Sequence, residues 1–193
     1  MRTLLISLLL AASALAQTTP TPAPAAAKIP PLNVQVMVAT KQRNVATSDY
    51  EKTMTIEPKM TIEGKSRMAP IPALDATLVI VTMDTRAKYK AGNDAFKVHA
   101  AQTLPLAEGK DGTRRPVEFE TSTVTFDTAR DSSNMGGAIY KYFVSGVQDA
   151  TSKEIVDFQT NNASLATFCK AHPEKRAEFL GLKKGAKFPA EFK

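Results

Sequence analysis

Apolar and polar side chains alternate along the middle of this sequence, and this period of two restricts its fold more than any other feature. Leu32, Val34, Val36 and Val38 fall on one face of an extended chain, because successive side chains of a strand point to opposite faces. Turn-forming Gly, Asn and Asp residues separate this run from the next ones. Comparable runs rich in Val, Ile, Thr, Tyr and Phe follow at residues 50–57, 76–83, 96–100, 117–126, 139–147 and 154–160.

Residues 32–160 are therefore expected to form an all-β domain, an antiparallel immunoglobulin-like β-sandwich of seven to eight strands. The likeness is one of architecture, because the chain has one Cys and no Trp and lacks the Cys…Trp…Cys pattern of true immunoglobulin domains. Residues 76–83 are apolar on both faces and predict a central strand. Within residues 117–126 the apolar positions shift from odd to even numbers, so an extra residue near Thr121–Thr123 predicts a β-bulge.

After residue 160 the pattern changes to that of short helices. An Asn-rich start before Leu165, Phe168 and Cys169 predicts one helix, and Pro173 begins or precedes a second. Residues 161–182 are expected to dock on the sandwich as a helical segment. The basic tail that follows, residues 183–193, is expected to be exposed and mobile.

The first sixteen residues have the composition of a cleaved signal peptide. Their apolar run is shorter than a membrane-spanning helix requires, although a retained N-terminal anchor is the alternative. A small-x-small pattern predicts cleavage between Ala16 and Gln17. Residues 17–31 are rich in Pro, Thr and Ala and predict a disordered, extended arm. We therefore expect a secreted or periplasmic protein without a membrane span.

The positive charge is concentrated at the C-terminal end. The full chain carries a net charge of +6, and residues 170–193 hold seven basic and three acidic residues. Lys183, Lys184 and Lys187 are therefore predicted to form a surface that contacts anionic partners. Cys169 is a single cysteine and has no partner within the chain, so it is either a buried thiol or a link to another molecule.

Few residues have a pattern that points to catalysis. Cys169 and His172 are three residues apart and can form half of a metal site or a thiolate–imidazole pair, but a thiol packed beside an aromatic side chain is the commoner case. Glu118 and Glu120 have the spacing of glycosidase carboxylates, yet their alternation with apolar residues is typical of a half-solvated strand. His99 is out of phase with its apolar neighbours and is expected to face solvent.

Two further motifs are weak. Residues 127–134 hold oxygen ligands, but they lack the spacing of a calcium loop and include Arg130. Residues 162–164 form a glycosylation sequon, which has meaning only in a eukaryotic source. Phosphate-loop, Gly-x-Ser-x-Gly and His-Glu-x-x-His motifs are missing from the sequence. We predict no catalytic residue, cofactor or metal site.

These observations favour an exported, non-enzymatic binding or scaffolding module of the cell envelope or extracellular space. Its partner is expected to be an envelope protein or an anionic surface, with no specific role for nucleic acid. Two alternatives stay open. One is a hydrolase whose carboxylates are brought together by the fold, and the other is a periplasmic chaperone or assembly subunit that acts by strand addition.

Overall fold

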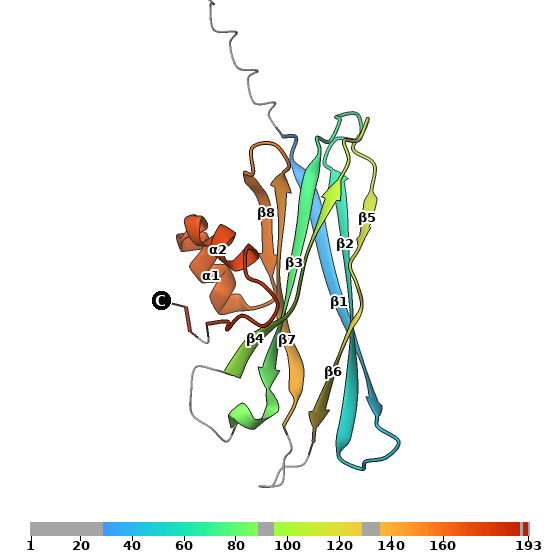
Figure 1. The fold of residues 1–193 in the computed structure, drawn as a ribbon. Helices are drawn as coiled ribbons and strands as arrows, with labels where there is room; N and C mark the ends of the chain where they lie inside the picture. The colour runs from blue at the N-terminus through green and yellow to red at the C-terminus, as the bar shows by residue number, and fades with distance from the viewer. Residues whose placement is uncertain (1–28, 89–94, 129–135, 190, 193) are drawn as a thin grey trace, which may run out of the picture.

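Two antiparallel sheets and a C-terminal helical segment make up the structure, a computed structural model that describes residues 29–88, 95–128, 136–189 and 191–192. The first sheet has the order β1–β2–β5, and β6 also pairs with β2; the second sheet has the order β4–β3–β7–β8 (Figure 1). The strands are β1 (Leu32–Asn44), β2 (Glu51–Gly64), β3 (Leu74–Asp84), β4 (Phe96–Leu106), β5 (Arg115–Glu118), β6 (Ser122–Asp127), β7 (Ala138–Asp149) and β8 (Ile155–Thr160).

The predicted fold class, an all-β antiparallel sandwich with short C-terminal helices, is confirmed. The two sheets lie face to face, and the helices lie on the side of the second sheet that faces away from the first (Figure 1). The helices are α1 (Ala163–Ala171) and α2 (Arg176–Leu180), with short 3₁₀ turns η1 (Thr85–Lys88) and η3 (Pro173–Lys175).

The main core fills the space between the sheets. Alternate residues of β2, among them Ile56, Met60 and Ile62, are buried against alternate residues of β3, such as Leu78 and Ile80. Each strand therefore places one of its two faces in this core, as the period of two predicts.

Strand β3 is central, as predicted from its two apolar faces, and it pairs with β4 on one side and β7 on the other. Its even-numbered residues from Leu74 to Ile80 enter the main core, whereas Val79 and Val81 face the helices. The helices thus cover a second apolar cluster on the outer face of the second sheet, so the molecule has three layers at this position.

The predicted bulge is also confirmed. Lys59 pairs with Glu118 and Ile56 pairs with Ser122, so two residues of β2 lie opposite three residues, Phe119–Thr121. Pro58 lies on β2 at this interruption and has no N–H to donate to a ladder. The extra residue allows Phe119 and Phe126 to face the same core.

The C-terminal segment supplies much of the second cluster. The Asn162 side chain accepts a hydrogen bond from Leu165 N (3.1 Å) and caps α1. Six of the nine phenylalanines lie in or against this cluster: Phe96, Phe158, Phe168, Phe179, Phe188 and Phe192. An apolar layer of this size explains why β3, β7 and β4 are apolar on their outer face.

The predicted signal peptide, its cleavage site at Ala16 and Gln17, and most of the predicted arm lie outside the described residues. Within the part of the chain that is described, no helix has the length and apolar character required to cross a membrane.

Candidate anion-contact surface

The basic segment after α2 is folded onto the edge of β4, which corrects the prediction of a mobile tail. Gly185 N donates to Val98 O (2.8 Å), Val98 N donates to Ala186 O (2.9 Å), and Phe188 N donates to Phe96 O (3.0 Å). Gly185 has a φ of 86°, a left-handed conformation that glycine adopts without steric penalty. The segment therefore extends the second sheet beyond β4 over a few residues.

Phe188 anchors this segment. Its side chain is 1% exposed and packs against Tyr142 (ring centroids 5.5 Å apart) and Phe179 (5.4 Å). Burying an aromatic ring stabilises a segment by about 2 kcal/mol relative to leaving the ring exposed. The lysines of this segment favour exposure to solvent, but the burial of the Phe188 ring outweighs that preference.

The anchored segment holds its lysines in fixed positions. Lys183, Lys184 and Lys187 are all exposed, as the sequence predicts for an anion-contact surface. Lys187 forms an isolated antiparallel bridge with Lys97 of β4, whose side chain is also exposed. We call Lys97, Lys183, Lys184 and Lys187 the lysine surface.

His99 lies beside the lysine surface and is half-buried, whereas the sequence predicted exposure to solvent. Burial lowers the pKa of its imidazole, and the positive charge of Lys184 lowers the pKa further. The C-terminal segment packs along β4 and covers part of this strand, which the period of β4 alone does not indicate. His99 therefore stays neutral near pH 7 and adds no charge to the lysine surface.

Cys169 and His172 are not combined into a site. Cys169 is 1% exposed within the second cluster, and burial raises the pKa of its thiol. His172 is exposed, its Nδ1 lies 3.3 Å from Glu174 Oε1, and its ring lies 4.8 Å from the ring of Phe168. No group of three metal-ligating residues occurs among the described residues.

Glu118 and Glu120 are exposed, and Glu120 has a structural role. Gln102 of β4 donates its Nε2 to Glu120 Oε2 (2.9 Å), and Glu120 N donates to Gln102 Oε1 (2.9 Å). The side chain of Gln102 thus satisfies the backbone N–H that the bulge frees, and it links the two sheets along one edge.

Residues 127–134, which hold oxygen ligands without the spacing of a calcium loop, fall mostly on residues 129–135, outside the described residues. Asp127, at their start, donates its backbone N–H to Gly136 O (2.9 Å). Asn162 of the glycosylation sequon is half-buried and acts as the α1 cap.

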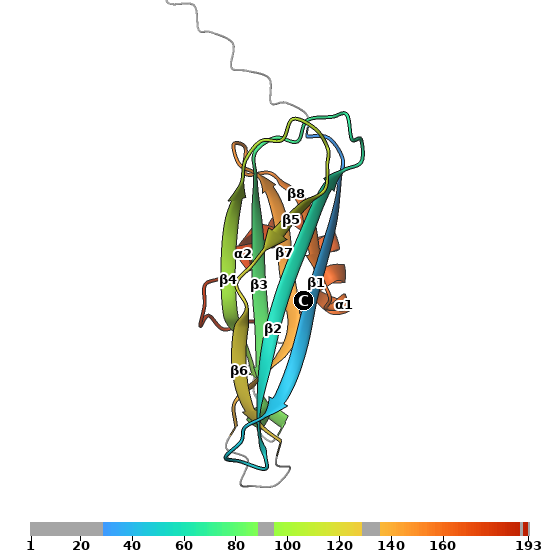
Figure 2. The same ribbon diagram turned by 90° about the vertical axis from the view of Figure 1, so that its right-hand side faces the viewer.

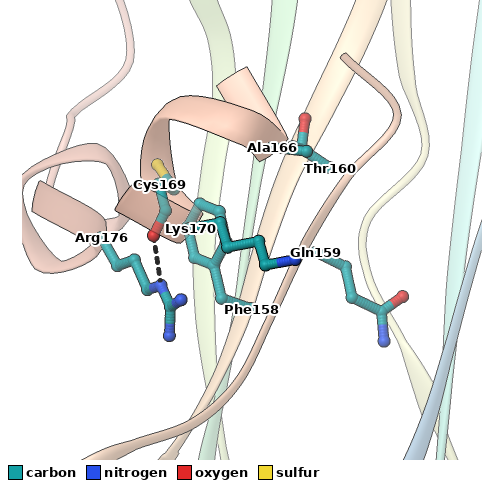
Figure 3. A pocket seen from close by; sticks show the side chains of 7 residues that line it. All are labelled: Phe158, Gln159, Thr160, Ala166, Cys169, Lys170 and Arg176. Atoms are coloured by element: carbon teal, nitrogen blue, oxygen red, sulfur yellow. Dashed lines mark hydrogen bonds between the residues drawn. The ribbon is translucent and has the colours of Figure 1, made fainter. Parts of the chain in front are cut away.

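A hollow of about 410 Å³ lies between β8 and α1 (Figure 3). It is lined by Phe158, Gln159, Thr160, Ala166, Cys169, Lys170 and Arg176. Arg176 donates its Nε to Cys169 O (3.0 Å) and its guanidinium lies 5.7 Å from the centre of the Phe158 ring. The lining holds two cations and no carboxylate, so it lacks the pair of carboxylates that the hydrolase alternative requires.

A second, wider hollow of about 460 Å³ lies on the other side of α1, and its lining includes Phe168, His172 and Phe192. Cys169 lines the first hollow and His172 the second, on different sides of the same helix. Neither hollow brings a thiol and an imidazole together.

The comparisons with known proteins give little guidance. No family model matches the chain, and no curated protein matches it. A crystal structure from Akkermansia muciniphila is similar over 69% of this chain and 72% of that chain, with 15% sequence identity and a TM-score of 0.31. A likeness at this level carries no information about function.

Sequence reasoning found three of the four lysines and missed Lys97. The missing lysine lies nearly ninety residues before the others, in a strand whose edge is covered only because Phe188 is anchored. The sequence signal that could have indicated it is Phe188, an aromatic residue directly after Lys187.

Proposed function

We propose that this protein is an exported binding module that contacts anionic partners through the lysine surface. The observation that carries the proposal is the position of the exposed Lys183, Lys184 and Lys187 on a segment that is hydrogen-bonded to the edge of β4. Strand pairing brings Lys97 to the same edge, and several lysines gathered at one edge give a positive potential that attracts anionic groups.

The fixed backbone beneath the lysines supports the same proposal. Three main-chain hydrogen bonds and the Phe188 anchor hold the segment, so little backbone freedom is lost when a partner binds. A disordered basic tail would lose more conformational entropy on binding.

Export is the second part of the proposal, and it rests on the signal-like residues 1–16. The partner is then an anionic surface or protein of the cell envelope or the extracellular space. The immunoglobulin-like layout is likewise a proposal. The strand order supports it, because β1, β2 and β5–β6 share one sheet and β3, β7 and β8 share the other. Strand β4 differs from the constant-type layout, since it pairs with β3.

Binding to vesicles that contain anionic phospholipid tests the proposal. Lys183, Lys184 and Lys187 are changed together to Glu, and binding is measured against salt concentration. Each lysine near an anionic surface contributes about 1 kcal/mol, so loss of three weakens binding by about a hundredfold. Binding of the unchanged protein should also fall as salt rises, because exposed charges are screened within about 8 Å at physiological ionic strength.

The matched control is a triple change of three exposed lysines far from the C-terminal segment, Lys59, Lys65 and Lys110, to Glu. Both variants have the same net charge, so a difference between them reports position and not total charge. Lipopolysaccharide replaces the vesicles in a parallel assay. Equal binding by the two variants, or no binding by the unchanged protein to either probe, would refute the proposal.

A further inference from the structure

Among the described residues, one edge of the sandwich is long, regular and uncovered from Val36 onward. Strand β1 has thirteen residues, and all of them pair with β2 in one uninterrupted register. Figure 2 shows β1 along one side of the first sheet, with β5 and β6 along the opposite side. An exposed strand edge is a template for pairing with another chain, and natural proteins usually interrupt, shorten or cover it.

The other three edges have such protection. The edge formed by β5 and β6 is broken at residues 119–121, where Gln102 holds Glu120, and Phe126 of β6 is bridged by Gly137. The edge of β4 carries the C-terminal segment at Phe96 and Val98. Strand β8 has only six residues and an irregular register.

Two hydrogen bonds show which backbone groups of β1 face outward. Lys65 N donates to Pro31 O (2.9 Å), so odd-numbered residues direct their backbone groups toward β2. Gln159 Nε2 donates to Val34 O (2.7 Å) from the other side, so even-numbered residues direct theirs to the free edge. Val36, Val38, Thr40 and Gln42 therefore present N–H and C=O groups outward.

The side chains of β1 provide little protection. Residues 32–40 include no Pro and no charged residue, and the charges of β1 are confined to Lys41 and Arg43 near its end. Met37, in the middle of the strand, is 64% exposed and is one of the few large apolar side chains on the described surface. Uncharged, proline-free segments of high β propensity are those that pair edge to edge.

We propose that the edge of β1 pairs with β1 of a second copy of this chain, antiparallel, with the two-fold axis at Ala39. The Gln159 side chain occupies the outward carbonyl of Val34, so the free part of the edge starts at Val36. With the axis at Ala39, Val36 pairs with Gln42 of the other copy and Val38 with Thr40. These pairs make roughly eight main-chain hydrogen bonds.

The charges of β1 fit this arrangement. Lys41, whose Nζ lies 2.8 Å from Glu57 Oε1, is placed opposite Met37 of the other copy, where its aliphatic stem covers the exposed thioether. The two Lys41 residues are then about 14 Å apart along the strands, beyond the screening length of about 8 Å. In a parallel pairing, Lys41 and Arg43 would lie beside the same residues of the other copy, and these like charges would repel each other.

The association closes at two copies. After pairing, each outer edge of the joined sheet is the interrupted edge of β5 and β6, which offers no regular ladder. The proposal therefore predicts a dimer and no fibre.

Analytical ultracentrifugation across a wide concentration series tests it, on the chain from residue 17 onward, which retains every described residue. The unchanged protein is expected to dimerise reversibly. Val38→Pro removes an outward N–H and leaves the β1–β2 ladder intact, and Ala39→Lys places two ammonium groups opposite each other at the axis. Each change is expected to raise the dimer dissociation constant about tenfold or more.

Val38→Thr and Ala39→Ser are the matched controls, because they retain the N–H groups and add no charge. Their dissociation constants are expected to equal that of the unchanged protein. Circular dichroism verifies the fold, and Ala39→Lys, an exposed change, keeps the test valid if Val38→Pro does not fold. A monomer at every concentration overturns the proposal and leaves the edge to a different partner. A dimer that is unaffected by Ala39→Lys also overturns it.

Discussion

At the scale of single residues, Cys169 illustrates how burial decides chemistry. Its side chain, on the buried face of α1, is 1% exposed, and desolvation raises its pKa, although the charge of Arg176 acts in the opposite direction. The thiolate is the reactive form of cysteine, so a raised pKa and low exposure both suppress reaction.

We therefore predict that Cys169 resists alkylation in the folded protein and reacts at once in denaturant. Mass spectrometry after iodoacetamide treatment measures this difference. Non-reducing electrophoresis is expected to show a single monomer band. A dimer band that dithiothreitol removes would instead identify Cys169 as a link between chains.

Asp157 of β8 is a second residue whose surroundings oppose its charge. Burial raises the pKa of its carboxyl, while the hydrogen bond from Gln159 Nε2 (3.0 Å) and the charge of Arg176 lower it. An acid whose pKa is raised by folding destabilises the folded state wherever the carboxyl is ionised. The destabilisation is absent below the ordinary pKa of 3.8, grows as pH rises above it, and is complete once pH exceeds the raised value.

Asp157→Asn should thus stabilise the protein near neutral pH, by less than about 1 kcal/mol because the carboxyl is still partly solvated. The gain should disappear as pH falls toward the ordinary pKa. Urea denaturation at several pH values measures it. A gain that is independent of pH, or a loss near neutrality, would show that the charge of Asp157 is well compensated.

At the scale of elements, the docking of α2 depends on one glycine in β7. A Cβ atom on Gly146 would lie 2.4 Å from Leu180 Cδ1, so the absence of a side chain lets Leu180 pack directly on the sheet. Overpacking of a core usually costs about 1–3 kcal/mol.

Gly146→Val is expected to destabilise the protein by about 2 kcal/mol and to loosen α2. The two residues are in contact, so their effects should not add. Leu180→Ala should cost less in the Gly146→Val background than alone, and denaturant titration of the four proteins measures this coupling. Additive effects would mean that α2 does not press on β7 at this position.

The elements also show what the sequence could predict. The period of two located the strands, and the phase shift between Phe119 and Phe126 located the bulge, because both depend on neighbours within one strand. The folded C-terminal segment was missed because its lysines have the composition of a solvated tail. Its order depends on Phe188, whose partners Tyr142 and Phe179 come from distant parts of the chain.

The candidate surface was predictable to a similar degree. Lys183, Lys184 and Lys187 are adjacent in sequence, and their excess charge is visible in it. Lys97 joins them through a strand pairing that no local pattern indicates. The link between Gln102 and Glu120 was missed for the same reason, since its residues are eighteen positions apart on different sheets.

At the scale of the whole molecule, three layers enclose two separate apolar clusters. The two sheets enclose the main core, and the C-terminal layer covers the second sheet and holds the lysine surface. The proposed contacts lie on different parts of the molecule, with the lysine surface at the edge of β4 and the dimer edge on β1. A dimer would then present two lysine surfaces, and two linked sites raise the affinity for a surface with many anionic groups.

The central claim is that the basic C-terminal segment is part of the folded sandwich and not a mobile tail. Amide hydrogen exchange of Gly185 and Phe188 tests it most directly, because their N–H groups bond to Val98 O and Phe96 O. We predict that both amides exchange far more slowly than in an unstructured peptide and approach the protection of β3 amides. Exchange of both at the rate of an unstructured chain, while β3 remains protected, would contradict the account.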